Sequence, residues 1–514
     1  MRATKWLRVI VVLAALAVTA LSAQAPSVSF ILGEATIADL HGRMASGQDT
    51  SRSLVEQYLA RIEAIDRHGP ELRSVLEINP DARAIADGLD AERRSGRVRG
   101  PLHGIPILIK DNIATGDRML TTAGSLALAA APAPKDSFVV ERLRAAGAVI
   151  LGKTNLSEWA NFRSAHSSSG WSGRGGQTRN PYALDRNPSG SSSGTGAAIA
   201  ASLGAAGVGT ETDGSIVSPS SNAALVGIKP TLGLVSRTGI VPIAHSQDTA
   251  GPMARTVADV VVLLGVIAGS DPRDAATRNA GVRGRRDYAP FLDRNGLNGA
   301  RIGVVRNRLF GYSPAADRLA DAAIADMKRV GAVVVDPANI STLGTFDETE
   351  LDVLMYEFKA DLSRYLMSLG PSALVHSLKD VIAFNEAHAD EELRYFGQDI
   401  MTKSEAKGPL ASARYKAALA RNHLLSRAQG IDAVMIRLRL DALVAPTGGP
   451  AWLADPVNGD GGMASAPAPS TVTAVAGYPH ITVPMGSVHG LPVGISFFGR
   501  AWSEPRLIRI AYAY

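Results

Sequence analysis

The sequence predicts an α/β sandwich in which helices cover a largely buried β-sheet. Two short apolar runs, LHGIPILIKD at 102–111 and GAVILG at 147–152, are typical of buried strands, and a helical pattern at 137–146 joins them. This strand–helix–strand order is typical of α/β layers. The 514-residue chain has 46% hydrophobic and 20% charged residues, which is enough to build a large core and excludes a disordered chain.

The remaining elements follow in chain order. Ser53 and Glu56 form a capping-box pattern that predicts a helix, because apolar residues then recur on one face. A second helix is expected after Asn79-Pro80. Residues 349–440 are polar and strongly helical, so we expect a helical cap or insertion within one domain rather than a separate domain. The other expected elements are helices at 196–206 and 315–331, strands at 300–306, 442–447, 479–485 and 492–498, and a final helix that contains Tyr514.

The first 25 residues predict a secretory leader. Three basic residues precede a 13-residue apolar run at 9–21, and an Ala-Gln-Ala cleavage pattern follows at 23–25. Thirteen residues are too few to span a bilayer, which needs about 20, although a retained anchor is the alternative. Pro26 directly after the cut leaves the cleavage site open, with Ser22 as the other position. We expect export to the periplasm or the medium, no stable membrane insertion, and a mature domain over 26–514.

Composition excludes several classes of function. The chain has no Cys, so disulfides, a thiol nucleophile and cysteine-ligated metals are excluded. Lys and Arg exceed Asp and Glu by 53 to 48, and by 50 to 48 without the leader. A near-neutral chain gives no electrostatic reason to expect a nucleic-acid partner. No metal-ligand cluster stands out, so we expect no metal and no cofactor. We also expect a monomer.

A loop rich in Gly and Ser is the first candidate site. Half of the 30 residues at 167–196 are Gly or Ser, but Trp171 and Arg174 interrupt them and an Ala-rich helix follows, which favours an ordered site loop over a flexible linker. Residues 190–194 match the G-x-S-x-G nucleophile elbow, which would make Ser192 the nucleophile. That elbow requires a strand immediately before it, and the preceding residues are typical of turns.

His480 and His489 are more typical of structural or surface residues than of a partner base.

A lysine is the next candidate for a base, but only as a neutral amine, which requires burial. Three of the 11 Lys end apolar runs or begin a segment directly after one: Lys110, Lys153 and Lys229. Periodicity alone does not choose among them.

Five motifs in order resemble the amidase signature family, and most closely its bacterial peptide amidases. They are GIPILIKDN (104–112), GKTNLSEWANF (152–162), NPSGSSSGTGAAIAA (187–201), GTETDGSIVSPSSNAALVGIKPT (209–231) and SQDTAGPMARTVAD (246–259). The resemblance extends from about residue 30 to the end of the chain. It implies a large mixed sheet between helical layers in a single domain.

The resemblance also implies a Ser–cis-Ser–Lys triad. Ser215 matches the nucleophile, Ser191 the bridging serine that follows a cis peptide bond, and Lys110 the base. The backbone N–H groups of Thr212, Asp213, Gly214 and Ser215 match the oxyanion donors. Asp213 replaces the commoner Gly, and Ser218 stands where many members carry Arg or Cys. Neither change removes a catalytic atom.

The implied activity is hydrolysis of a peptide C-terminal amide with release of ammonia. Asn161, Phe162 and Arg163 belong to a loop that resembles the peptide-amidase version, and they are the expected substrate-binding residues. The alternatives are a general aliphatic or aryl amidase, the A subunit of a glutamine-dependent tRNA amidotransferase, and a binding module without catalysis. A fatty-amide enzyme is disfavoured, because residues 27–66 contain one ordinary amphipathic helix and no membrane-binding helix pair.

Overall fold

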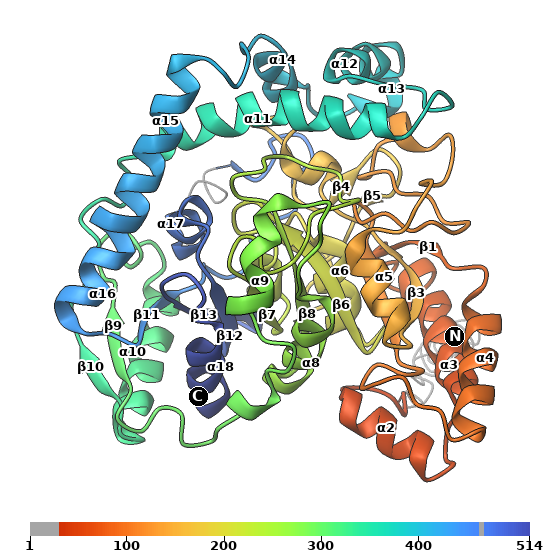
Figure 1. Ribbon diagram of the computed structural model, residues 1–514, viewed down its shortest axis with the longest axis horizontal. Coiled ribbons are helices and arrows are strands. Elements are labelled where there is room, and N and C mark those ends of the chain that lie inside the picture. Colours follow the sequence, from red (N-terminus) through yellow and green to blue (C-terminus); the bar gives the residue numbers. More distant parts are fainter. Residues whose placement is uncertain (1–29, 462–466) are drawn as a thin grey trace, which may run out of the picture. The chain divides into compact units, whose positions relative to one another are not determined.

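An eleven-stranded mixed sheet runs through the computed structural model, which describes residues 30–461 and 467–514 (Figure 1). Its strands are, in spatial order, β1 (Val75–Ile78), β3 (Val149–Thr154), β2 (Pro106–Lys110), β6 (Ala206–Glu211), β8 (Thr249–Ala254), β7 (Val226–Lys229), β12 (His480–Val488), β13 (Leu491–Phe498), β11 (Ala442–Pro446), β9 (Arg301–Val304) and β10 (Val333–Val335). β2 pairs in parallel with β3 and β6, whereas β6 and β8 are antiparallel. The predicted mixed α/β sheet is confirmed.

The predicted strands lie where the apolar runs are. β2, β3, β9, β11, β12 and β13 all overlap the expected segments. Every residue of β2, β3 and β6 is buried. This burial explains why these segments are nearly continuous apolar runs instead of alternating patterns. A separate small sheet, β4 (Trp171–Ser172) with β5 (Gly176–Gln177), lies in the Gly/Ser loop, which is therefore ordered.

Helices precede, separate and follow the strands. They are α2 (Ile37–Ala45), α3 (Ser51–Arg61), α4 (Ala82–Arg94), α5 (Phe138–Ala145), α6 (Ser193–Ala200), α7 (Val217–Asn222), α8 (Val257–Ile267), α9 (Ala280–Arg283), α10 (Pro314–Arg329), α11 (Asp347–Ser368), α12 (Leu378–Ala387), α13 (Ala389–Glu392), α14 (Asp399–Glu405), α15 (Ala413–His423), α16 (Asp432–Leu438), α17 (Pro469–Ala476) and α18 (Glu504–Ala513). Residues 349–440 thus carry most of α11 and all of α12–α16, as the helical pattern predicts. Among the described residues, no helix has both the length and the apolar character needed to cross a membrane.

Three helices differ from the prediction. Residues 27–66 contain two helices, α2 and α3, where one was expected. α3 begins at Ser51 because Thr50 is its N-cap, and the reciprocal cap bond comes from Ser53, whose hydroxyl accepts from Thr50 N at 2.9 Å. Glu56 is bonded to Arg52 and Arg83 instead. α6 begins at Ser193, inside the Gly/Ser segment, and ends at Ala200, so it starts and stops earlier than the Ala-rich pattern predicts.

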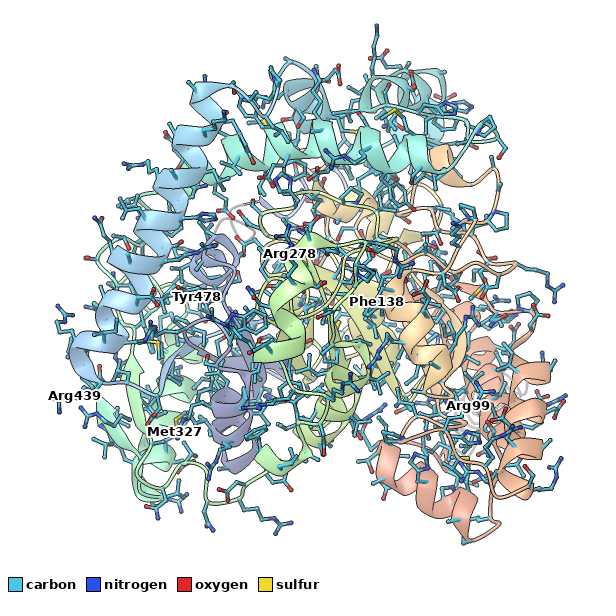
Figure 2. The ribbon with its side chains drawn as sticks, in the orientation of Figure 1. Arg99, Phe138, Arg278, Met327, Arg439 and Tyr478 are labelled. Atoms are coloured by element: carbon cyan, nitrogen blue, oxygen red, sulfur yellow. The ribbon has the colours of Figure 1, made fainter. Side chains whose placement is uncertain are left out.

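Two helices, α6 and α7, pack on the sheet next to the candidate site. α6 packs against β2, β3, β6 and β8, and α7 packs against β7, β12 and β13. α10 packs on β10, β11 and β12, and Figure 2 shows Met327 of α10 in that part of the structure, with Arg439 at its margin. Ala35–Tyr514 form one compact unit. Of the preceding unit, residues 30–34 are described and form a turn, and the predicted leader lies outside the described residues.

Candidate active site

Parallel pairing of β2 and β6 determines where the candidate residues meet. Ile109 of β2 pairs with Val208 of β6, so the carboxyl ends of both strands lie at the same edge of the sheet. Lys110 is the last residue of β2, and the turn that contains Ser215 follows the end of β6. This is the edge at which open α/β sheets place their ligands.

Ser191 reaches the same edge from the loop before α6. Lys110 Nζ and Ser191 Oγ are 2.8 Å apart. The Gly190–Ser191 peptide bond is cis, as the family resemblance implies. Ser192 N donates to Ser215 O at 3.1 Å, which connects the loop directly to the turn after β6. The structure therefore brings the three predicted triad residues into one region.

Lys110 has the environment that a neutral amine requires. Its side chain is 0% exposed, and this burial lowers the pKa of Lys110 to about 7, although the charges of Asp248 and Glu211 oppose the shift. Besides Ser191, Nζ contacts Thr210 Oγ1 at 2.9 Å and Thr210 O at 3.3 Å. A neutral amine has two protons for Thr210 and one lone pair that accepts from the Ser191 hydroxyl, so these contacts match its bonding capacity.

The other two lysines are buried as well, and burial lowers the pKa of each to about 8. Lys153 Nζ donates to Ile113 O and to Thr121 Oγ1, and Lys229 Nζ donates to Pro230 O. None of the three lysines lines the cavity at Ser215. Burial alone therefore does not distinguish the three lysines, but contact with Ser191 does.

Ser215 lines a cavity of about 280 Å³. Gly214 has φ 74°, a left-handed conformation that glycine adopts without strain. The hydrogen bonds of the described residues include none donated by the backbone N–H groups of Thr212, Asp213, Gly214 or Ser215. Glu211 Oε2 holds the end of this turn by accepting from Ile216 N at 2.7 Å and Val217 N at 3.0 Å. The turn therefore presents free donors beside Ser215, as an oxyanion site requires.

The nucleophile-elbow alternative does not fit this geometry. No strand among the described residues directly precedes Gly190, and the Ser192 hydroxyl is engaged by β6, donating its proton to Thr210 O and accepting from Thr210 N. His480 is buried against Ser496 and Thr473, and burial lowers its pKa to about 3. His489 is exposed in the turn between β12 and β13. Both histidines are structural or surface residues.

The expected substrate residues divide into two groups. Asn161 and Phe162 line the cavity at Ser215, whereas Arg163 does not. Arg163 is 0% exposed, and its guanidinium is bonded to Glu158 at 2.6 Å and to two backbone carbonyls. It also stacks on the rings of Trp171 and Phe396. The structure therefore corrects the expectation for Arg163, which is buried away from the cavity and bonded within the protein through its two terminal guanidinium nitrogens.

Sequence reasoning missed other residues of this cavity. Asn222, Trp452 and Asp460 line it, although they lie on three separate segments. Asp460 accepts from Ser169 N, Ser169 Oγ, Asn187 Nδ2 and Trp452 Nε1, so it connects the Gly/Ser loop to the C-terminal third. Asn222 lies in the same motif as Ser215, but no spacing rule marks it. Only the folded arrangement reveals these residues.

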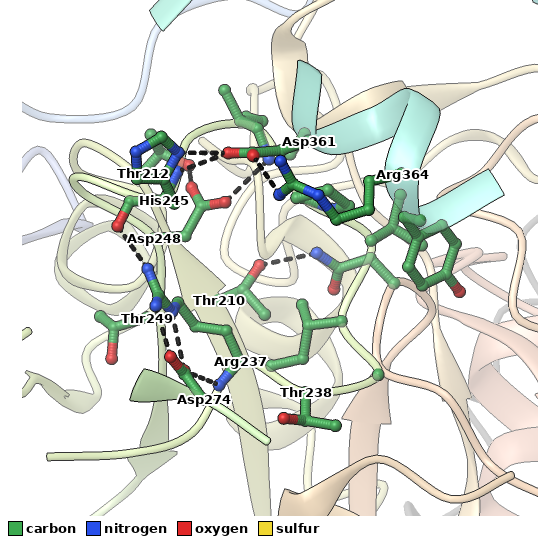
Figure 3. Close-up of a pocket in the computed structure, with 18 of the residues that line it drawn as sticks. Thr210, Thr212, Arg237, Thr238, His245, Asp248, Thr249, Asp274, Asp361 and Arg364 are labelled. Atoms are coloured by element: carbon green, nitrogen blue, oxygen red, sulfur yellow. Dashed lines mark hydrogen bonds and ion pairs between the residues drawn. The ribbon is translucent and has the colours of Figure 1, made fainter. Parts of the chain in front are cut away.

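A larger cavity of about 470 Å³ adjoins the first, and Ala160, Thr212 and Ile243 line both. Figure 3 shows that its charged residues face one another: Arg237 donates to Asp274 at 2.9 Å, and Arg364 to Asp361 at 2.9 Å. His245, Glu357 and Asp361 are the one group in the described residues whose atoms are close enough to hold a metal ion. His245 Nδ1 already lies 2.7 Å from Asp361 Oδ2, and Glu357 accepts from Tyr415 at 2.7 Å. Ser215 does not line this cavity.

Comparisons with known proteins agree with the geometry. The Amidase family model matches residues 53–508. A probable amidase from Arabidopsis thaliana is 43% identical over 497 residues, which cover 95% of this chain and 91% of that protein. The structure of the peptide amidase from Stenotrophomonas maltophilia matches with 51% identity and a TM-score of 0.90 over 94% of this chain and 97% of that one. A glutamyl-tRNA(Gln) amidotransferase subunit from Symbiobacterium thermophilum is 35% identical over 93% of this chain and 95% of its own.

The family model covers most of the chain, and the fold and the motifs at the sheet edge agree with it. The chain belongs to the amidase signature family and is a hydrolase that acts on amides.

Proposed function

We propose that the protein removes ammonia from the C-terminal amides of peptides by means of a Ser215–Ser191–Lys110 triad. The observation that carries the proposal is the contact of a fully buried Lys110 with Ser191, next to a turn whose N–H donors are free. Similarity to a peptide amidase over nearly the whole chain supports the substrate class.

The proposed reaction is acyl transfer. Ser215 Oγ attacks the amide carbonyl carbon, its proton passes to Ser191, and the Ser191 proton passes to Lys110 Nζ. The N–H groups of the turn at residues 212–215 stabilise the negative oxygen of the tetrahedral intermediate. Collapse of this intermediate returns a proton through Ser191 to the leaving nitrogen, which departs as ammonia. Water then attacks the ester on Ser215 and releases the carboxylic acid.

The charge of the cavity favours a substrate without a carboxylate near the scissile bond. Among the described residues that line it, Asp213 and Asp460 are acidic and none is Lys, Arg or His. Ser218, at the position where many family members carry Arg, is bonded to Ser189 Oγ at 2.8 Å. A substrate carboxylate would therefore find no cationic partner among these residues. A peptide amide satisfies this condition, whereas free glutamine, the substrate class of the amidotransferase alternative, does not.

Four substrates separate the remaining alternatives. The purified mature chain is assayed for ammonia from an amidated dipeptide, from a long-chain fatty amide and from glutamine, and for the free amino acid that would be released from the same peptide extended by one residue with a free carboxylate. We expect the highest kcat/KM on the amidated dipeptide. Faster hydrolysis of the fatty amide would favour the general amidase alternative, and cleavage of an internal bond would indicate a peptidase. Efficient release of ammonia from glutamine would favour the amidotransferase alternative.

We also propose that the protein is exported and monomeric. The leader pattern at 1–25 supports export. N-terminal sequencing of protein from the periplasm or the medium tests this, with a start at residue 23 or 26 expected and an intact Met1 contradicting it. Light scattering of the same sample tests the monomer.

A further inference from the structure

Two asparagines outside the triad carry unpaired polar atoms in the cavity at Ser215. Asn161 Oδ1 and Asn222 Nδ2 are both buried, and neither has a hydrogen-bond partner among the described residues. Both residues line the cavity. Since buried polar atoms are nearly always paired with protein, water or ligand in native proteins, unpaired atoms that line a cavity are available to pair with a bound substrate.

The neighbours of Asn161 determine the orientation of its amide. Ser169 Oγ donates its only proton to Asp460 Oδ2 at 2.6 Å, so toward Asn161 it must accept. Asn161 Nδ2 is the donor in that contact, at 3.0 Å, and Oδ1 is left as a free acceptor. The backbone at Asn161 has φ 71°, a left-handed conformation that Asn tolerates better than most residues. The side chain is therefore held through Nδ2, which leaves Oδ1 at the cavity.

Asn222 provides the complementary group. It is the last residue of α7, the short helix that begins two residues after Ser215, and it is 3% exposed. Its Nδ2 is a donor whose position relative to Ser215 is fixed by that helix. Asp213 Oδ1, in the oxyanion turn itself, is a further buried acceptor without a partner among the described residues. Among the described side chains that line it, the cavity thus contains one unpaired buried donor, Asn222 Nδ2, and two unpaired buried acceptors, Asn161 Oδ1 and Asp213 Oδ1. These atoms are additional to the groups that act on the scissile carboxamide.

We propose that Asn161 and Asn222 bind the peptide group that precedes the scissile carboxamide, with Asn161 accepting from its N–H and Asn222 donating to its carbonyl oxygen. A peptide group has one donor and one acceptor, which match these two atoms. An aliphatic amide has neither at that place. The inference rests on the proposed function and specifies its substrate class as N-acylated amino-acid amides, of which an amidated peptide is one.

The test compares three amides that share a leucine-like side chain: N-acetyl-leucinamide, N-acetyl-N-methyl-leucinamide and 4-methylpentanamide. The enzymes are the wild type, Asn161→Gly, which removes the acceptor and accepts the left-handed backbone, and Asn222→Ala, which removes the donor. The control is Asn295→Ala, at an exposed residue that does not line the cavity. Thermal unfolding of each variant checks that it is folded.

We expect N-methylation to lower kcat/KM of the wild type about tenfold or more, as loss of one buried hydrogen bond does. Asn161→Gly should lose about the same factor on N-acetyl-leucinamide and show no further loss on N-methylation, because the two changes remove the same contact. Asn222→Ala should lose more on N-acetyl-leucinamide than on 4-methylpentanamide, and Asn295→Ala should keep the wild-type ratio between these substrates.

Two results would overturn the inference while leaving the proposed function intact. One is equal hydrolysis of the methylated and unmethylated amides by the wild type. The other is an Asn161→Gly enzyme that still discriminates between them, which would make the discrimination steric. If the wild type hydrolyses none of the three amides, the proposed function fails together with the inference.

Discussion

The two adjoining cavities differ in a way that their size does not reveal. The larger one, about 470 Å³, is lined by Arg237, Arg364 and His245, each paired with a carboxylate. The smaller one, about 280 Å³, has no cationic residue among the described residues that line it, and it contains free N–H groups and unpaired amide atoms. Paired charges stabilise the protein, whereas unpaired polar atoms remain available to a substrate. Unsatisfied bonding capacity, rather than volume, therefore distinguishes the candidate active site from the larger cavity.

The largest effect is expected from removing the nucleophile in the smaller cavity. Ser215→Ala should lower kcat on an amidated dipeptide by about 10⁴-fold or more, and adding Lys110→Ala should cost little further because triad members act as a unit. Ser191→Ala should also be severe. Steady-state ammonia release measures these losses. The matched control is Thr238→Ala, which removes a hydroxyl from the larger cavity and should leave kcat near the wild-type value. Near-normal activity of Ser215→Ala, with loss in Ser192→Ala, would restore the elbow alternative.

The pH profile should follow Lys110. Its folded pKa is lowered by burial to about 7, and the neutral amine is the active form. Activity should therefore be full above this value and should fall about tenfold per pH unit as the pH drops well below 7. The measurement is kcat/KM from pH 5 to 9. Lys110→Arg should stay inactive at every pH in that range, because an arginine remains protonated. A rate that rises toward acidic pH would contradict a lysine base.

A stability effect without a catalytic one is expected from the larger cavity. Arg237→Ala removes the partner of Asp274 and should lower the free energy of unfolding by about 1–3 kcal/mol, since it leaves a buried carboxylate without its ion pair. Denaturant unfolding gives the stability, and kcat of the folded variant should stay close to the wild-type value. A large fall in kcat with unchanged stability would assign the larger cavity to the reaction.

The smallest effect is expected from metal removal. His245, Glu357 and Asp361 could approach one ion, but their hydrogen bonds to one another and to Tyr415 already use them. Incubation with EDTA, followed by the ammonia assay, should leave kcat unchanged. Loss of activity that Zn²⁺ restores would show that this cluster takes part in the reaction.

The fold could be predicted from sequence where burial is complete. β2 and β3 are buried along their whole length, so their apolar runs at 102–111 and 147–152 mark them clearly. Helix starts were less predictable, because several hydroxyl residues compete for the N-cap and packing decides among them. The start of α3 illustrates this, since Thr50 is the N-cap and Ser53 completes the box.

The site could be predicted where residues lie inside continuous motifs. Lys110, Ser191 and Ser215 each lie in a motif shared with the family, and the pairing of β2 with β6 explains why they meet. The expectation that Arg163 binds substrate was wrong. Nothing in the sequence shows that the buried carboxylates of Glu158 and Glu392 lie beside its guanidinium. Asp460 lies more than 240 residues from Ser215 in the sequence, and no local pattern connects the two.

Covalent labelling tests the central claim most directly. The wild-type enzyme is mixed with an amidated dipeptide, quenched in acid within the first turnover, and analysed by mass spectrometry with peptide mapping. The account predicts one acyl group, equal in mass to the dipeptide acyl moiety, on Ser215, and none in Ser215→Ala. An acyl group on Ser192, or turnover without any acyl group on the protein, would contradict the account.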